Sequence, residues 1–248
     1  MMRIFRFIFF LYAMILLIPA FLIFMVFFFI VFTCWPADKA PHFAHRYVSR
    51  TGAAIIFILL FTRLKVKNRH YIDPNRTYIF VSNHQSQLDI PAFARACTNT
   101  FRFLAKAELT KIPVIGYIIR KLYISVKRAD KNDRARSMEA MMASLRENIS
   151  VAVYVEGTRN RTDKPLLDFK DGAFRLAIES GLPLAILTVT DSRKLLDSNR
   201  PLELSPGVIH CAWSMPVETK GMTQSDLPSL KEKARQLMLA ELAAAGVS

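Results

Sequence analysis

The sequence predicts an α/β domain, with a central sheet of about seven strands flanked by helices, behind an N-terminal membrane-anchoring helical segment. Short apolar runs alternate with helical patterns after Thr62, where charged and turn-forming residues begin to interrupt the chain. Several of these runs are continuously hydrophobic, which is typical of strands buried on both faces of a sheet. No charged side chain occurs from Phe7 to Trp35. We therefore divide the chain into membrane-associated helices, residues 1–62, and an α/β domain, residues 63–248.

The uncharged stretch at the N-terminus is 29 residues long, and about 20 residues suffice to cross a hydrocarbon core. The apolar region of a signal peptide is about half that length, and the residues after Cys34 make a poor cleavage site, so we expect an uncleaved anchor. Pro19 lies mid-way and can kink or break a helix, which leaves open whether the segment spans the bilayer or enters one leaflet. A second apolar segment, residues 53–61, is too short to span and is expected at the membrane interface.

The chain is strongly basic, with 34 Lys and Arg against 20 Asp and Glu and a formal net charge of +14. This balance predicts an anionic partner. Nucleic acid is excluded as that partner because the sequence offers no aromatic platform or recognition helix, so anionic membrane lipids are expected instead. Basic residues after position 35 outnumber Arg3 and Arg6, which favours a cytoplasmic position for the α/β domain.

The three cysteines, Cys34, Cys97 and Cys211, are far apart and lie in apolar surroundings. They form no pattern typical of a disulfide framework or a zinc site. We expect buried, reduced thiols and no metal.

The strands and helices follow from apolar runs and helix caps. The expected strands are residues 64–68, 77–82, 101–106, 122–126, 150–155, 183–189 and 208–214. The expected helices are residues 90–96, 114–122, 132–146, 171–179 and 227–245. Asn132 is the expected cap of the third helix, whose methionines repeat at three- and four-residue spacing and are assigned to the core.

One candidate site follows the apolar run that ends at Ser82, where His84 and Asp89 stand five residues apart. Five residues of helix would turn the two side chains to different faces, so they meet only if the chain turns between them. Pro91 favours a helix that starts near Asp89, which leaves His84 in a loop. A carboxylate on one ring nitrogen would leave the other as a general base. The alternative is structural, because Asp89 is also a good helix N-cap and Ser86 to Asp89 resembles a capping box.

A second candidate site, Glu156-Gly157-Thr158-Arg159, follows another apolar strand. Glycine permits a close approach of the backbone, and arginine offers a planar fork to a phosphate group. The alternative is an ordinary turn with a surface Glu–Arg pair, which contributes little to stability. A base and an anion-binding group at two strand ends together favour a catalytic site.

The Asn83-His84-x-x-x-x-Asp89 pattern, followed by Glu156 to Arg159, resembles the glycerolipid acyltransferase family, most of all bacterial 1-acyl-sn-glycerol-3-phosphate acyltransferases. The resemblance extends from about Val66 to Thr190, and residues 169–174 are similar to a further family segment. It implies that His84 and Asp89 are catalytic and that Glu156, Gly157, Thr158 and Arg159 hold the acceptor phosphate. Lys106, at the end of a strand, either adds a second positive contact or is a solvated lysine.

Arg128 matches the family's middle block, whereas Lys127 stands where an aspartate is common. This added positive charge fits an anionic head group without selecting one.

The resemblance implies transfer of a fatty acyl group from an acyl carrier protein or coenzyme A thioester to lysophosphatidate, forming phosphatidate, without a cofactor. It also implies a place at the bacterial inner membrane, with the α/β domain on the cytoplasmic face. Two alternatives stay open at this point. The acceptor is another lysophospholipid or an amino-acid-derived lipid, or the chain is a catalytically silent lipid-binding protein.

Overall fold

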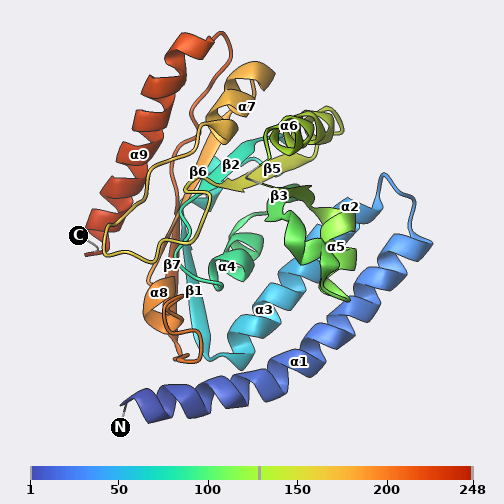
Figure 1. The fold of residues 1–248 in the computed structure, drawn as a ribbon, viewed down its shortest axis with the longest axis vertical. Helices are drawn as coiled ribbons and strands as arrows, with labels where there is room; N and C mark the ends of the chain where they lie inside the picture. Colours follow the sequence, from blue (N-terminus) through green and yellow to red (C-terminus); the bar gives the residue numbers. More distant parts are fainter. Residues whose placement is uncertain (1, 128–129, 247–248) are drawn as a thin grey trace.

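The computed structural model describes residues 2–127 and 130–246, and its strands form one seven-stranded sheet in the order β1-β7-β6-β2-β5-β3-β4 (Figure 1). Neighbouring strands are parallel except β6 and β7, which are antiparallel. The strands are β1 (Thr62–Lys67), β2 (Ile79–Ser82), β3 (Phe101–Lys106), β4 (Ile124–Val126), β5 (Ser150–Tyr154), β6 (Leu184–Thr190) and β7 (Gly207–Trp213). The predicted α/β sheet and each of its expected strands are confirmed, with ends that differ by up to two residues.

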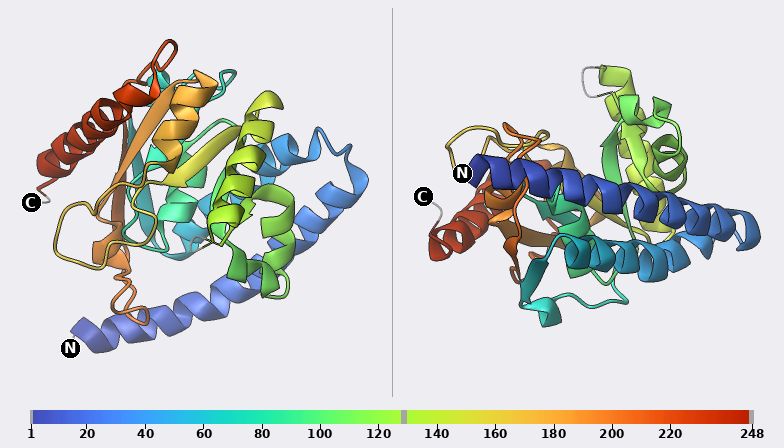
Figure 2. Two further views of the ribbon diagram at one scale, coloured as in Figure 1. Left: turned by 45° about the horizontal axis from the view of Figure 1, so that its top comes forward. Right: turned by 90° about the horizontal axis from the view of Figure 1, so that it is seen from below.

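Helices cover both faces of the sheet (Figures 1 and 2). On one face lie α6 (Lys131–Arg146), α7 (Gly172–Ser180) and α9 (Leu227–Ala244), and on the other α3 (Arg50–Leu59) and α4 (Asp89–Ala96). Helix α5 (Ile115–Leu122) contacts β3 and β4. Shorter helical elements of this domain include α8 (Ser192–Leu195) and the 3₁₀ turns η2 (Arg69–Tyr71), η3 (Ala107–Lys111) and η4 (Gln224–Asp226).

Strand β2 explains why the central runs are apolar throughout. All four of its residues are buried. Ile79 and Val81 join the core under α7 and α9, whereas Phe80 joins the core under α4, because successive side chains of a strand point to opposite faces. A strand covered by helices on both sides has no solvent-facing position, so it shows no polar alternation.

The N-terminal apolar run forms one helix, α1 (Met2–Cys34), which is long and apolar enough to cross a membrane. The helix continues on both sides of Pro19, so the break considered from the sequence is not found. Four of its residues, Ala13, Met25, Phe28 and Val31, are buried, and many of its other apolar side chains are exposed. The second apolar segment lies in α3, which follows α2 (Ala40–Phe43) and the π-helical η1 (Ala44–Ser49) and packs beside α1 (Figure 2).

Two local expectations are corrected by the structure. Helix α6 is capped by Asp130, not Asn132, because Asp130 Oδ1 accepts the backbone N–H groups of Asn132 at 2.8 Å and Asp133 at 3.2 Å. Cys34 is exposed at the end of α1, although Cys97 and Cys211 are buried as expected. Burial raises the pKa of the Cys97 thiol to about 12, which keeps this thiol protonated. All three cysteines are unbridged.

The sheet brings the polar loops together. Because β2, β3, β5 and β6 run in the same direction, their carboxyl ends lie at one edge of the sheet. The segments that follow Ser82, Lys106, Tyr154 and Thr190 therefore meet at this edge, which is where open α/β sheets place their ligands.

Candidate active site

The loop after β2 is attached to β6 before it turns. Asn83 donates from Nδ2 to the carbonyl of Val189 at 2.8 Å, and its Oδ1 accepts the Val189 N–H at 2.8 Å. Asn83 is fully buried, so both bonds are shielded from water. This amide therefore extends the strand pairing and fixes the point from which His84 projects.

His84 and Asp89 meet through this loop. His84 Nδ1 lies 2.8 Å from Asp89 Oδ2, which also accepts the backbone N–H groups of Gln85 at 2.6 Å and Ser86 at 2.8 Å. The Asp89 side chain is 0% exposed and that of His84 is 12% exposed. Asp89 is the first residue of α4 and makes no side-chain cap, so the N-cap role considered from the sequence is not found. Its carboxylate instead closes the loop onto the imidazole ring.

The imidazole ring of His84 is stacked on Tyr154, the last residue of β5. Their ring centroids are 4.0 Å apart with an interplanar angle of 15°, and Phe103 of β3 stacks on Tyr154 at 5.5 Å. Burial, followed by the charge of Asp89, raises the pKa of the Tyr154 hydroxyl well above its ordinary value. Tyr154 was not singled out from the sequence. The signal that could have found it is strand register, since Tyr154 pairs with Ser82, two residues before His84.

Glu156 joins the two sequence motifs. Its Oε1 accepts the backbone N–H of His84 at 2.9 Å, and its Oε2 accepts that of Leu167 at 2.9 Å. The residue is 2% exposed, and burial raises the pKa of its carboxyl. The backbone N–H of Asn160 donates to the carbonyl of His84 at 2.7 Å. Both carboxylate oxygens are thus occupied by the protein's own backbone, an arrangement that positions the His84 loop.

The rest of this motif forms an open turn. Gly157 has φ of +72°, a left-handed conformation that favours glycine, and an added Cβ would lie 3.2 Å from Lys170 Cγ. Thr158 is exposed and Arg159 is half-buried. No carboxylate in the described part of the chain lies within salt-bridge distance of Arg159, so its guanidinium is not committed to an internal ion pair.

Lys106 is not joined to this network. Lys106 ends β3 on the same sheet edge, but its side chain is 60% exposed and its Nζ lies 3.7 Å from Glu108. Arg128 lies outside the described residues. Direct hydrogen bonds therefore connect His84, Asp89 and Glu156, and Arg159 follows three residues later.

The arrangement has the parts that acid–base chemistry needs. The hydrogen bond to Asp89 holds one ring nitrogen of His84, and the described residues provide no hydrogen-bond partner for Nε2. Across residues 2–127 and 130–246, no group of three His, Cys, Asp or Glu side chains is placed to hold a metal ion. A base with one oriented nitrogen, next to a turn with an uncommitted arginine, suits the deprotonation of an anionic substrate.

Comparison with known proteins gives a consistent result. A family model described as Acyltransferase matches residues 63–190, just over half of the chain. The 1-acyl-sn-glycerol-3-phosphate acyltransferase alpha of Mus musculus is 30% identical over 180 residues, and the human protein of the same name is 29% identical over 180 residues. Each alignment covers 71% of this chain and 62% of the relative, so the chain spans less than two thirds of the length of these curated relatives.

A solved structure matches the whole chain. The crystal structure of the 1-acyl-sn-glycerophosphate (LPA) acyltransferase PlsC from Thermotoga maritima superposes with a TM-score of 0.84 at 24% identity. The match covers 100% of this chain and 99% of that protein. The two chains therefore share a fold, N-terminal helices included.

Proposed function

The chain belongs to the acyltransferase family, and we propose that it transfers a fatty acyl group from an acyl thioester to the free hydroxyl of 1-acyl-glycerol-3-phosphate, forming phosphatidate. The relatives from mouse and human are named for activity on this acceptor. The observation that carries the proposal is the 2.8 Å contact between His84 Nδ1 and Asp89 Oδ2 at the sheet edge. It orients one ring nitrogen of His84, and the described residues leave the other without a hydrogen-bond partner.

In the proposed reaction His84 is the general base and Asp89 orients it. Nε2 accepts the proton of the glycerol hydroxyl while the oxygen attacks the carbonyl carbon of the thioester. The carbon–sulfur bond then breaks, and the leaving thiolate takes up the proton that His84 carries. Asp89 stabilises the imidazolium formed between these two proton transfers. The acyl group passes directly from sulfur to oxygen.

We assign the acceptor phosphate to the turn that follows β5. Gly157 keeps this turn free of a side chain, and Arg159 offers two parallel N–H groups to phosphate oxygens. We also assign Lys106, at the end of the neighbouring strand β3, to add a point charge. Glu156 is assigned a positioning role, because both of its oxygens already accept backbone N–H groups.

We place the enzyme at the bacterial inner membrane with the α/β domain on the cytoplasmic face. Helix α1 carries the apolar surface. Basic residues that follow it, including the exposed Arg46, Arg63 and Lys65, would attract anionic lipid head groups by about 1 kcal/mol each near the surface. A cytoplasmic domain also meets the proposed donors, acyl carrier protein and coenzyme A thioesters.

The acceptor is tested with purified protein, a radiolabelled acyl thioester and a panel of lysolipids that differ only in head group. We expect labelled phosphatidate from lysophosphatidate, with a higher rate than for uncharged or zwitterionic head groups. Faster acylation of another lysolipid would reassign the acceptor. Binding of lysolipids without transfer to any of them would favour a silent lipid-binding protein.

The phosphate assignment makes a narrower prediction. Arg159→Ala should raise the KM for lysophosphatidate by about tenfold or more, because a charge-assisted hydrogen bond is lost. Arg161→Ala is the matched control, since Arg161 is an exposed arginine two residues away. Equal KM values for both variants and the unmodified protein would remove Arg159 from the acceptor site.

A further inference from the structure

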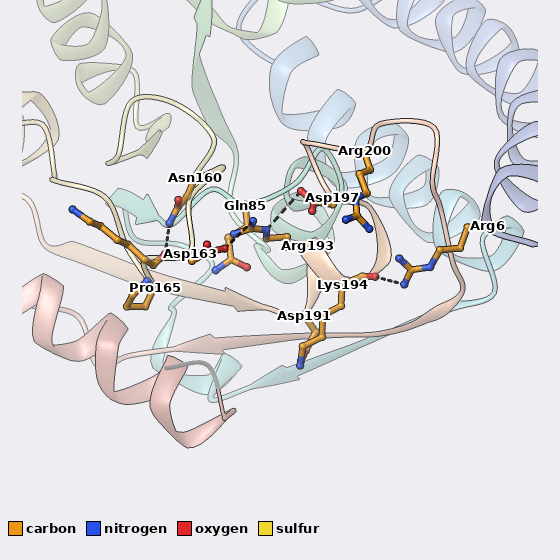
Figure 3. A pocket seen from close by; sticks show the side chains of 11 residues that line it. Arg6, Gln85, Asn160, Asp163, Pro165, Asp191, Arg193, Lys194, Asp197 and Arg200 are labelled. Atoms are coloured by element: carbon orange, nitrogen blue, oxygen red, sulfur yellow. Dashed lines mark hydrogen bonds and ion pairs between the residues drawn. The ribbon is translucent and has the colours of Figure 1, made fainter. Parts of the chain in front are cut away.

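A cavity of about 380 Å³ lies beside the His84 loop (Figure 3). Its walls come from four places in the sequence: the start of α1, the loop after β2, the loop around Asn160, and the segment that follows β6. Gln85 and Asn160 line it and also belong to the active-site network, since each donates a backbone hydrogen bond to the His84–Asp89 loop. The cavity is therefore the direct neighbour of the proposed base.

Cations dominate the wall of this cavity. Its lining includes five basic side chains and three carboxylates. The basic residues are Arg6, Lys164, Arg193, Lys194 and Arg200. An excess of positive charge in a concave, partly enclosed space attracts an anion more strongly than the same charge spread over a surface.

The carboxylates in the wall are already paired. Arg193 lies 3.8 Å from Asp163 and 3.6 Å from Asp197, and Lys194 Nζ lies 2.6 Å from Asp191. The other three cations in the wall, Arg6, Lys164 and Arg200, therefore determine the electrostatic potential inside the cavity.

The remaining cations have few internal partners. Arg6 donates to the carbonyl of Lys194 at 3.0 Å, and within the described residues neither Arg6 nor Lys164 has a carboxylate within salt-bridge distance. Arg200 contacts only the carboxylate of Glu203 there, at 3.8 Å. Figure 3 shows the guanidinium groups of Arg6 and Arg200 directed toward the space between them.

The cavity is distinct from the proposed acceptor site but lies next to it. The Arg159 turn follows β5 and Lys106 ends β3, and neither Arg159 nor Lys106 is among the residues that line the cavity. The cavity wall is built from residues 160–165, which come directly after that turn, and from residues 191–200, which follow β6 on the other side of β2. The site thus has a second group of cations besides those assigned to the acceptor.

We propose that this cavity binds a phosphate ester of the acyl donor, beside the turn to which the acceptor phosphate is assigned. The inference rests on the proposed function, in which both substrates carry phosphate and meet at one base. Coenzyme A and the prosthetic arm of acyl carrier protein both attach the thioester to a phosphorylated pantetheine. A volume of about 380 Å³ exceeds a single phosphate group and lies in the range of small-molecule sites, roughly 300–1,000 Å³.

The test compares the donor with and without its phosphate. Palmitoyl-coenzyme A or palmitoyl-acyl carrier protein, whichever reacts faster, is used beside palmitoyl-pantetheine, which lacks phosphate. Arg200→Gln should raise the KM for the phosphorylated donor about tenfold, as expected for one charge-assisted hydrogen bond. It should leave the KM for palmitoyl-pantetheine and for lysophosphatidate unchanged.

Three further variants make the result decisive. Lys164→Gln removes a second lining cation and should act in the same direction. Arg146→Gln is the control, because Arg146 is exposed in the last turn of α6, outside the cavity. Circular dichroism verifies that each variant is folded. In a His84→Ala background, calorimetry with coenzyme A measures binding without turnover, and Arg200→Gln should weaken this binding as well.

Each contrary outcome has its own meaning. A raised KM for lysophosphatidate, with the donor unaffected, would move the acceptor phosphate into the cavity and overturn the proposal. Loss of activation by phosphatidylglycerol vesicles in Arg200→Gln, with both KM values unchanged, would assign the cavity to a lipid head group instead. If Arg200→Gln transfers the acyl group with an unaltered KM for the phosphorylated donor, the cavity assignment is refuted and the proposed function stands. Absence of transfer in the unmodified protein refutes the proposed function, and calorimetry still tests the cavity.

Discussion

The molecule contains two histidine–carboxylate pairs of nearly equal geometry at the same sheet edge. His84 Nδ1 lies 2.8 Å from Asp89, and His210 Nδ1 lies 2.9 Å from Asp191. Their surroundings differ. The first pair is 12% and 0% exposed, whereas the second is 39% and 15% exposed. Asp89 Oδ2 accepts two backbone N–H groups, whereas the other carboxylate also contacts Lys194 Nζ at 2.6 Å.

The two pairs share a hydrogen bond but not an environment, and we expect the environment to decide which histidine acts as a base. Burial by itself would raise the pKa of Asp191, but hydrogen bonds from Lys194 and His210 outweigh it and hold this pKa below its ordinary value. That carboxylate divides its charge between two partners, and its histidine faces water. Asp89 has the His84 imidazole as its side-chain partner, and both side chains are largely shielded from water, where an electrostatic interaction is stronger.

Removing each histidine in turn should produce the largest contrast. His84→Ala should lower kcat by about 10²–10⁴-fold, the usual contribution of a general base. His210→Ala should leave kcat within about twofold, because an exposed pair contributes little. Initial rates of phosphatidate formation measure both. Comparable losses in the two variants would mean that the second pair also takes part in the chemistry.

The sequence predicted the first pair and not the second for a physical reason. His84 and Asp89 are close in the chain, so a strand end, a turn and Pro91 suffice to place them together. Asp191 and His210 meet because β6 and β7 are antiparallel with Thr190 opposite His210. Such a contact depends on strand register, which local patterns do not contain.

The distinction between local sequence signals and contacts that only the folded chain creates also applies to the fold. Continuous apolar runs identified the central strands β2 and β6, since burial on both faces leaves a local signature. The cap of α6 was assigned two residues late, because Asp130 and Asn132 are both good caps and only the structure decides between them. The exposure of Cys34 was missed because an apolar neighbourhood predicts burial, and α1 presents much of that apolar surface outward.

Glu156 is a further difference between the two pairs. It accepts the backbone N–H of His84, whereas in the described part of the chain no side-chain carboxylate accepts the backbone N–H of His210. Glu156→Gln would place an amide N–H₂ opposite a backbone N–H of His84 or Leu167 and should lower the free energy of unfolding by about 1–3 kcal/mol. Urea unfolding of the detergent-solubilised protein, followed by circular dichroism, measures this.

The pH dependence has a defined sign. Because burial raises the pKa of Glu156 in the folded state, its contribution to stability is fully present below the pKa of the unfolded chain. That contribution is lost as the pH rises through the raised folded pKa. The difference in the free energy of unfolding between the unmodified protein and Glu156→Gln should therefore be larger under acidic conditions. A difference that grows with pH instead would show that the bonds to the ionised carboxylate outweigh burial.

The stacking of His84 on Tyr154 is expected to have the smallest effect. It is also a difference between the two pairs, because the described structure places no aromatic ring against His210. Tyr154→Phe keeps the ring and removes a buried hydroxyl that has no hydrogen-bond partner in the described chain, so kcat should stay within about twofold. Tyr154→Leu removes the ring and should lower kcat about tenfold, the upper end of what one aromatic pair contributes. If stacking orients the imidazole, the loss appears in kcat while both KM values remain constant. Equal rates for the two variants would show that the buried carboxylate alone positions His84.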